Sequence, residues 1–156
     1  MDNEEKSEII FMNNFYKILP ELKKEFRKFL VEKKYFDPKT DGFSYQMSMG
    51  LSFFILELFK NNRHEDLKKI FNFIEDQVGI DSDIDESIEV LIFEGIMNVI
   101  KGDDKDNNTH QFKEFEKLLG SKSIQLCRKN EALWDSLDRE PKSLGNMIRF
   151  LKERNQ

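Results

Sequence analysis

The sequence predicts an all-α fold, a single-domain bundle or layered stack of about six to eight antiparallel helices. Apolar residues recur at steps of three and four along most of the chain, and no strand-like alternation lasts for more than a few residues. A length of 156 residues fits one domain. We therefore expect residues 1–156 to form one unit, with flexible termini near 1–6 and 153–156 and polar loops near 37–43 and 102–109.

Four helices are expected in the first half of the chain. Pro20 separates the first two, because proline is tolerated at the first position of a helix. Gly50, in the third, is expected to permit close packing against a neighbour. Asn61-Asn62 ends the third helix, and Gly79 is a fitting stop after the fourth. Their apolar positions are Ile9, Met12, Tyr16 and Leu19, then Leu22, Phe26, Phe29 and Leu30, then Met47, Leu51, Phe54, Ile55, Leu58 and Phe59, and then Leu67, Ile70, Phe71, Ile74 and Val78.

The next predicted helix is the most apolar and is expected to be central. Ser82, Asp83 or Asp85 can cap its N-terminus by accepting a backbone N–H. Its apolar stripe consists of Ile84, Ile88, Leu91, Ile92, Ile96 and Val99.

Three shorter helices are expected after the second polar loop. The first carries Phe112 and Phe115 and stops at Gly120. Ser121 or Ser123 can cap the second, on whose apolar side we expect a buried thiol. The last follows Pro141, and its expected apolar positions are Leu144, Met147, Ile148 and Leu151.

The composition excludes several classes of protein. One cysteine, Cys127, excludes an internal disulfide and a multi-cysteine metal site. A net charge of −5 argues against nucleic-acid binding. The longest apolar run is too short for a membrane span, and the acidic N-terminus is not a secretory signal, so we expect a cytoplasmic protein. Phosphate-binding glycine loops and catalytic motifs are absent, so we expect no cofactor and no enzymatic activity.

One stretch of the chain is strongly acidic. Between Lys69 and Lys101 there are eight carboxylates and no lysine or arginine. Such an asymmetry favours a docking face for a basic partner, because complementary fields speed encounter and reject wrong partners. The alternative is that these carboxylates stabilise helix N-termini through the helix dipole. The candidate partner-binding residues are Asp81, Asp83, Asp85, Glu86, Glu89 and Glu94.

Two segments resemble the start of a calcium-binding EF-hand loop, one at Asp81–Glu86 and one at Asp104–Asn108. That loop needs glycine at its sixth position and a bidentate glutamate at its twelfth. Neither segment meets these requirements, since the positions hold Glu86 and Ile92, and Thr109 and Phe115. We predict no metal site, and weak cation binding stays open.

Six segments of the chain carry a resemblance to a known family. They are Ile18-Leu19-Pro20-Glu21-Leu22-Lys23, Phe53-Phe54-Ile55-Leu56-Glu57-Leu58, Asp66-Leu67-Lys68-Lys69-Ile70-Phe71, Phe73-Ile74-Glu75, Glu94-Gly95 and Leu118-Leu119-Gly120-Ser121-Lys122-Ser123. These segments resemble a family of small all-helical bacterial domains found among candidate immunity proteins of polymorphic toxin systems. The resemblance extends from about residue 14 to residue 135, and the segment after residue 140 departs from it. It implies a binding protein whose partner is a toxin domain, and it implies no catalytic residues.

Two functions from different classes follow as expectations. The first is an immunity-type inhibitor that neutralises a cognate toxin. Its acidic helical segment would bind a basic toxin domain. The second is a small-molecule-binding protein or enzyme with a pocket between helices, toward which Glu57, Glu94 or His110 would converge. The oligomeric state is left open by both.

Overall fold

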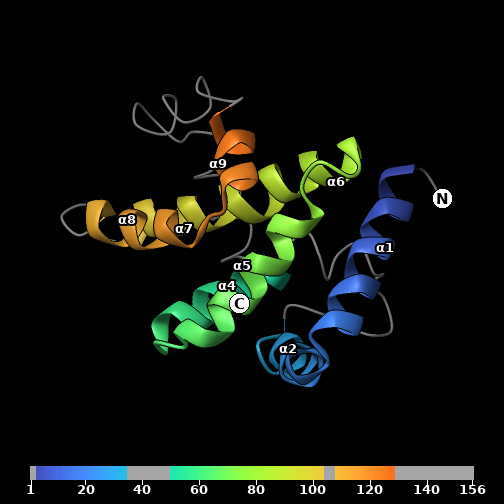
Figure 1. Ribbon diagram of the computed structural model, residues 1–156. Coiled ribbons are helices and arrows are strands. Elements are labelled where there is room, and N and C mark those ends of the chain that lie inside the picture. The colour runs from blue at the N-terminus through green and yellow to red at the C-terminus, as the bar shows by residue number, and fades with distance from the viewer. Residues whose placement is uncertain (1–2, 35–49, 104–107, 129–156) are drawn as a thin grey trace.

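The regular elements of the computed structural model are all helices, as predicted, within the residues that it describes: 3–34, 50–103 and 108–128 (Figure 1). The predicted loop at 37–43 and the predicted helix after Pro141 lie outside these residues. The helices are α1 (Asn3–Ile18), α2 (Pro20–Glu32), α4 (Leu51–Lys60), α5 (His64–Gln77), α6 (Ser82–Ser87), η2 (Ile88–Phe93), α7 (Glu94–Asp103), α8 (Asn108–Leu118) and α9 (Ser121–Arg128).

Three predicted boundaries are confirmed. Pro20 is the first residue of α2, and Asn61 caps the C-terminus of α4. Gly79 follows α5 with a φ of 90°, a left-handed conformation that glycine adopts without steric cost. Two other expectations are corrected. The expected flexible terminus near 1–6 is helical from Asn3 onward, and the expected loop near 102–109 is shorter, since only residues 104–107 separate the described parts of α7 and α8.

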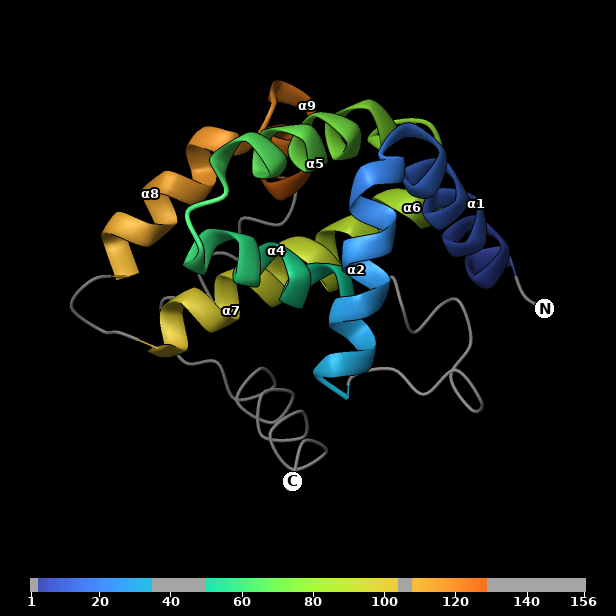
Figure 2. The same ribbon diagram turned by 90° about the horizontal axis from the view of Figure 1, so that it is seen from below.

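The central element is one long helix made of α6, η2 and α7, which follow one another without a break. Helix α1 packs against its α6 end, α8 packs against its α7 end, and α9 packs against η2 between them (Figure 1). Seen from below, α4 lies between α5 and α7 and packs against both (Figure 2). The predicted central position of the long helix is therefore confirmed.

The core is held largely by phenylalanines that meet edge to face. Phe73 lies 5.1 Å from Phe11 and 5.5 Å from Phe15, measured between ring centroids, so α5 is tied to α1. Phe115 of α8 lies 5.7 Å from Phe71 and 6.1 Å from Phe93. Such pairs contribute about 0.5–1.5 kcal/mol each beyond the burial of their apolar area.

Gly50 permits a close approach of α2 and α4, as the sequence predicts. A β-carbon at this position would lie 2.5 Å from Cδ2 of Leu30 and 3.3 Å from Cζ of Phe26. Both side chains are fully buried. A larger residue at position 50 would therefore require the buried side chain of Leu30 to shift.

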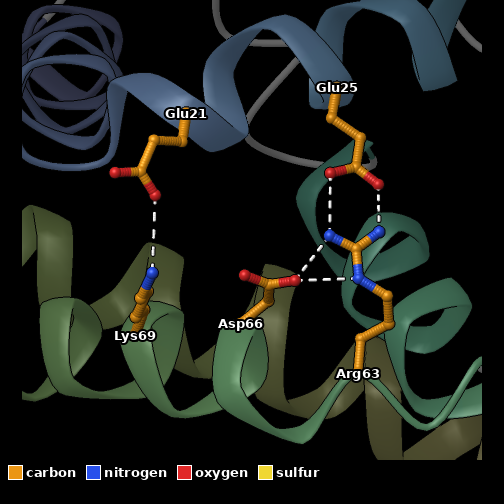
Figure 3. A network of polar contacts seen from close by, with 5 residues as sticks. All are labelled: Glu21, Glu25, Arg63, Asp66 and Lys69. Carbon is orange, nitrogen blue, oxygen red and sulfur yellow. Dashed lines mark hydrogen bonds and ion pairs between the residues drawn. The ribbon is translucent and has the colours of Figure 1, made fainter.

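A polar network joins α2 to α5 across the surface of this core (Figure 3). The guanidinium of Arg63 forms a bidentate ion pair with Glu25, and its Nε also donates to Asp66 at 2.8 Å. Nζ of Lys69, one turn after Asp66 in α5, lies 3.4 Å from a carboxylate oxygen of Glu21, which is one turn before Glu25 in α2. The hydrogen bonds that Arg63 donates to Glu25 and Asp66 raise the pKa of its guanidinium further, so that its charge is fixed.

Candidate functional site

Two of the predicted docking residues hold the turn that leads into the long helix. Asp81 is the N-cap of α6, and its carboxylate accepts hydrogen bonds from the backbone N–H of Asp83 at 2.8 Å and from the Ser7 hydroxyl at 3.0 Å. Asp85 accepts from the backbone N–H of Gly79 at 2.9 Å. The carboxylates of Asp81 and Asp85 therefore support the fold of this turn.

The prediction that Ser82, Asp83 or Asp85 caps this helix is wrong. Asp81 takes the role because its backbone is extended, with φ −143° and ψ 126°, which is the N-cap conformation. The bond from Ser7 also ties the cap to α1, from a distance of 74 residues along the chain. No local pattern could reveal that contact.

The remaining four predicted residues lie along the solvent-facing side of the long helix. Glu86 is exposed, whereas Asp83, Glu89 and Glu94 are partly exposed. We call these four carboxylates the acidic stripe. Two of its members differ from Asp81 and Asp85, which accept hydrogen bonds in the turn. Asp83 and Glu86 take part in no ion pair between described residues.

Two exposed apolar side chains accompany the acidic stripe. Val90 lies within it and is 39% exposed, and Ile80, in the turn before α6, is 74% exposed. Sequence reasoning missed both, because it placed every large aliphatic of this segment in the core or left it unassigned. In the sequence, Ile80 directly precedes Asp81 and Val90 directly follows Glu89.

A π-helical turn shapes the middle of the stripe. In η2 the backbone N–H of Glu94 donates to the carbonyl of Glu89, five residues earlier, so the two residues sit one turn apart. Burial, and then the charge of Glu89, raises the pKa of Glu94 above its ordinary value. The periodicity predicted an ordinary α-helix here, in which residues five apart would point in different directions.

The C-terminal end of α9 lies beside the same turn. Cys127 is buried, as predicted, and burial together with the nearby charge of Glu89 raises the pKa of its thiol to about 12. The thiolate is therefore scarcely populated at neutral pH, which argues against a nucleophilic role. Helix α9, which ends at Arg128, packs against η2, the turn that contains Glu89.

Another carboxylate of the acidic stretch, Glu75, caps α9 from a distance. Its oxygens accept from the backbone N–H groups of Lys122 at 2.7 Å and Ser123 at 3.0 Å, and from the Ser123 hydroxyl at 2.7 Å. The prediction that Ser121 or Ser123 caps this helix is thus wrong, since Ser121 is already its first residue and a side chain of α5 fills the capping position. Sequence spacing carries no signal for a cap 47 residues away.

Among the described residues, no group of three or more His, Cys, Asp or Glu side chains is arranged to hold a metal ion. Residues 104–107 of the second EF-hand-like segment lie outside the described residues, and so does the side chain of His110. Glu57 is partly exposed on α4.

The described helices include none that is long and apolar enough to cross a membrane.

The chain belongs to a family described as Domain of unknown function (DUF7674), whose model matches residues 12–135. That range contains the whole acidic stripe and ends before Pro141. Comparison with curated proteins and with solved structures finds no match.

Proposed function

We propose that this chain is a non-enzymatic protein-binding module, an immunity-type inhibitor that neutralises a cognate bacterial toxin through the acidic stripe. One observation carries the proposal: Asp83 and Glu86 stand at the surface without a described ion-pair partner, next to the exposed side chains of Ile80 and Val90. The toxin as the class of partner is supported only by the sequence's resemblance to candidate immunity proteins.

The physical case rests on the contrast with other surface carboxylates of the chain. Glu21, Glu25 and Glu65 each lie within 4 Å of a lysine or arginine nitrogen of the chain itself. Carboxylates of that kind are already partly neutralised. Asp83 and Glu86 instead present uncompensated charge, which attracts a cationic surface over the range of a Debye length, about 8–10 Å at moderate salt.

The exposed apolar side chains of Ile80 and Val90 would slow dissociation of a bound partner. Charge complementarity mainly raises the association rate, whereas burial of apolar anchors slows dissociation. Val90 lies between carboxylates and would be sealed from water once Lys or Arg side chains of the partner meet the stripe. A stable interface of this kind buries about 1,200–2,000 Å² in total, so the stripe would form its centre and its neighbours the rim.

The test is capture of a partner by the wild type and by two charge-reversed variants. Asp83→Lys with Glu86→Lys reverses the stripe, and Glu65→Lys with Glu116→Lys makes the same change in net charge elsewhere on the surface. Tagged protein is incubated with extract of the native host and washed at low and high salt, and retained proteins are identified by mass spectrometry. We expect one basic protein, retained at low salt by the wild type and the control variant.

The stripe variant should associate with that protein about tenfold or more slowly, since steering depends on charge near the contact. Expression of the captured protein alone should arrest growth, and co-expression with the wild-type chain should restore it. Equal binding by the stripe variant would contradict the role of the stripe, and a captured protein that is harmless would contradict the immunity-type function.

A further inference from the structure

We propose that copies of this chain associate head to tail, with the outer face of α2 in one copy docked on the acidic stripe of the next. The occupant of the α2 face is thus a second copy of the chain. This inference goes beyond the proposed function and needs no toxin. Its consequence for a basic partner is competition for the same carboxylates.

The outer face of α2 is basic, although three glutamates are interleaved with the lysines of this helix in the sequence. Helical spacing places Lys24, Arg27 and Lys28 on one side of α2, together with Val31, and all four are exposed. We call these four residues the basic face. Lys28 lies 3.7 Å from Glu32, whereas Lys24 and Arg27 take part in no ion pair between described residues.

The other two glutamates of α2 lie on a neighbouring side of the helix, where they are neutralised. Glu21 and Glu25 stand one turn apart and point toward α5 (Figure 3). Glu21 pairs with Lys69, and Glu25 forms the bidentate ion pair with Arg63. These ion pairs engage the acids of α2 with α5 and leave the cations on its outer face.

The basic face and the acidic stripe share one spacing. Exposed Val31 follows the cation Arg27 by four residues, and exposed Val90 follows the carboxylate Glu86 by four residues. In both helices another charge of the same sign stands three residues earlier. Each series covers about 10 Å of helix, so side by side the cations meet carboxylates and the valines meet each other. Opposite charges around an apolar contact are typical of protein interfaces.

The two faces lie apart in one molecule. The Ser7 hydroxyl joins the N-terminal part of α1 to Asp81 at the start of the long helix, whereas α2 begins at Pro20, just after α1 ends at Ile18. The helical steps from Ser7 to Ile18 cover about 16 Å, and α6 and α2 lie at opposite ends of α1 (Figure 1). Contact between two unlike faces so placed joins copies head to tail and can continue beyond a dimer.

Light scattering of the purified protein at about 1 μM to about 1 mM tests the association, a range in which weak interfaces dissociate. At low salt we expect the weight-average mass to rise with concentration above the monomer mass of 18.7 kDa. At about 1 M salt, where the Debye length is roughly 3 Å, the mass should return toward that of the monomer.

Charge reversal on each face in turn tests the pairing. Lys24→Glu with Arg27→Glu reverses the basic face, and Asp83→Lys with Glu86→Lys reverses the stripe. Each double variant alone should associate about tenfold or more weakly, because its two faces then carry the same sign of charge. An equimolar mixture of the two variants should associate again, because the stripe of the first meets the basic face of the second.

Two further variants provide the controls. Lys68→Glu with Lys113→Glu makes the same change in net charge at exposed lysines of α5 and α8, and should leave the association constant within about twofold. Lys24→Gln with Arg27→Gln removes the two cations without reversing them and should weaken association less than the reversal does. It also keeps the basic face testable where the reversed variant fails to fold, which circular dichroism of each variant detects.

Three outcomes would overturn the proposal. The mass could stay monomeric at every concentration in low salt, or the mixture of the two reversed variants could stay monomeric. Association that treatment with nuclease removes would assign the basic face to nucleic acid. These results are separable from the proposed function. Light scattering needs no partner protein, so a monomeric chain would leave charge-dependent capture intact, and a failure of capture would leave self-association intact.

Discussion

Folding changes the pKa of two carboxylates, Glu75 and Glu94, in opposite directions, because among the described residues hydrogen-bond donors reach only Glu75. Burial alone would raise the pKa of Glu75, but the hydrogen bonds from Ser123 and Lys122 outweigh it, and the pKa lies below its ordinary value. Glu94 is partly buried near Glu89, and its pKa lies above the ordinary value. The two therefore contribute to stability with opposite signs.

Glu75→Gln is expected to lower the free energy of unfolding at pH 7 by about 1–2 kcal/mol, as loss of a helix cap does. Because folding depresses the pKa of Glu75, its contribution is present above the ordinary value of 4.5 and is lost as the pH falls through the folded-state value. Urea unfolding at several pH values should thus show the variant and the wild type converging as the pH falls below 4.5 and through the folded-state pKa. A constant difference across that range would contradict the assignment.

Glu94→Gln is expected to raise the free energy of unfolding at pH 7, by about 0.2–0.5 kcal/mol, the size of like-charge repulsion at helical spacing. Folding raises the pKa of Glu94, so the cost of its charge is present above the folded-state value and disappears as the pH falls through it toward 4.5. The same urea titrations measure this. Destabilisation at pH 7 would show that Glu94 has a favourable partner.

At the scale of elements, α9 depends on a cap that another helix supplies. A β-carbon on Gly120 would fall on the carboxyl of Glu75, so Gly120→Ala should push that carboxyl away from Lys122 and Ser123. We expect a loss of about 1–2 kcal/mol in the free energy of unfolding. The matched test is the double variant with Glu75→Gln, in which the effect of Gly120→Ala should shrink. An equal loss in the wild-type and Glu75→Gln backgrounds would show that Gly120→Ala acts independently of the cap.

The contact of α2 with α4 depends on Gly50 in a similar way. Gly50→Ala should gain up to about 1 kcal/mol in helix propensity, yet its β-carbon would overlap Leu30. Overpacking a buried position costs about 1–3 kcal/mol, so we expect net destabilisation in urea unfolding. Leu30→Val removes part of the overlapping side chain and should reduce the cost of Gly50→Ala. A stabilised Gly50→Ala variant would mean that α2 and α4 can move apart freely.

Elements with local signals were predictable, and elements defined by contacts were not. Pro20 and Gly79 act through their own φ angles, so their roles can be seen in the sequence. The caps of α6 and α9 involve partners 74 and 47 residues apart, which no spacing rule connects. The π-helical turn at Ile88–Phe93 was also missed, because a single wide turn barely disturbs an apolar stripe of Ile and Phe.

For the whole molecule, the fold class followed from periodicity, whereas the candidate site followed only in part. The acidic stretch was visible as charge, and Asp83 and Glu86 do lie at the surface. Charge counting could not separate them from Asp81 and Asp85, whose oxygens are engaged in the turn before α6. That division depends on which backbone N–H groups the fold brings near each carboxylate, which is a property of tertiary structure.

The uneven distribution of charge over the molecule predicts that some carboxylates on its acidic side lower the free energy of unfolding. Asp76 is exposed in the last turn of α5, where no basic residue offsets the helix dipole, and Glu86 is exposed in the acidic stripe. Asp76→Asn with Glu86→Gln should therefore raise the free energy of unfolding by about 0.3–1 kcal/mol at low salt. Glu21→Gln with Glu65→Gln makes the same change in net charge at carboxylates that have lysine partners and lie in first turns, and should lower it.

Both differences should shrink between about 0.01 M and about 1 M salt, over which the Debye length falls from roughly 30 Å to roughly 3 Å. Urea midpoints at the two salt concentrations measure the effect. Changes of opposite sign in the free energy of unfolding of the two variants would mean that the carboxylates of the acidic side lower stability. Such a cost is expected where binding and stability place different demands on the same residues. Equal signs would show that only the net charge matters, and the acidic stripe would then lose its distinction from the rest of the surface.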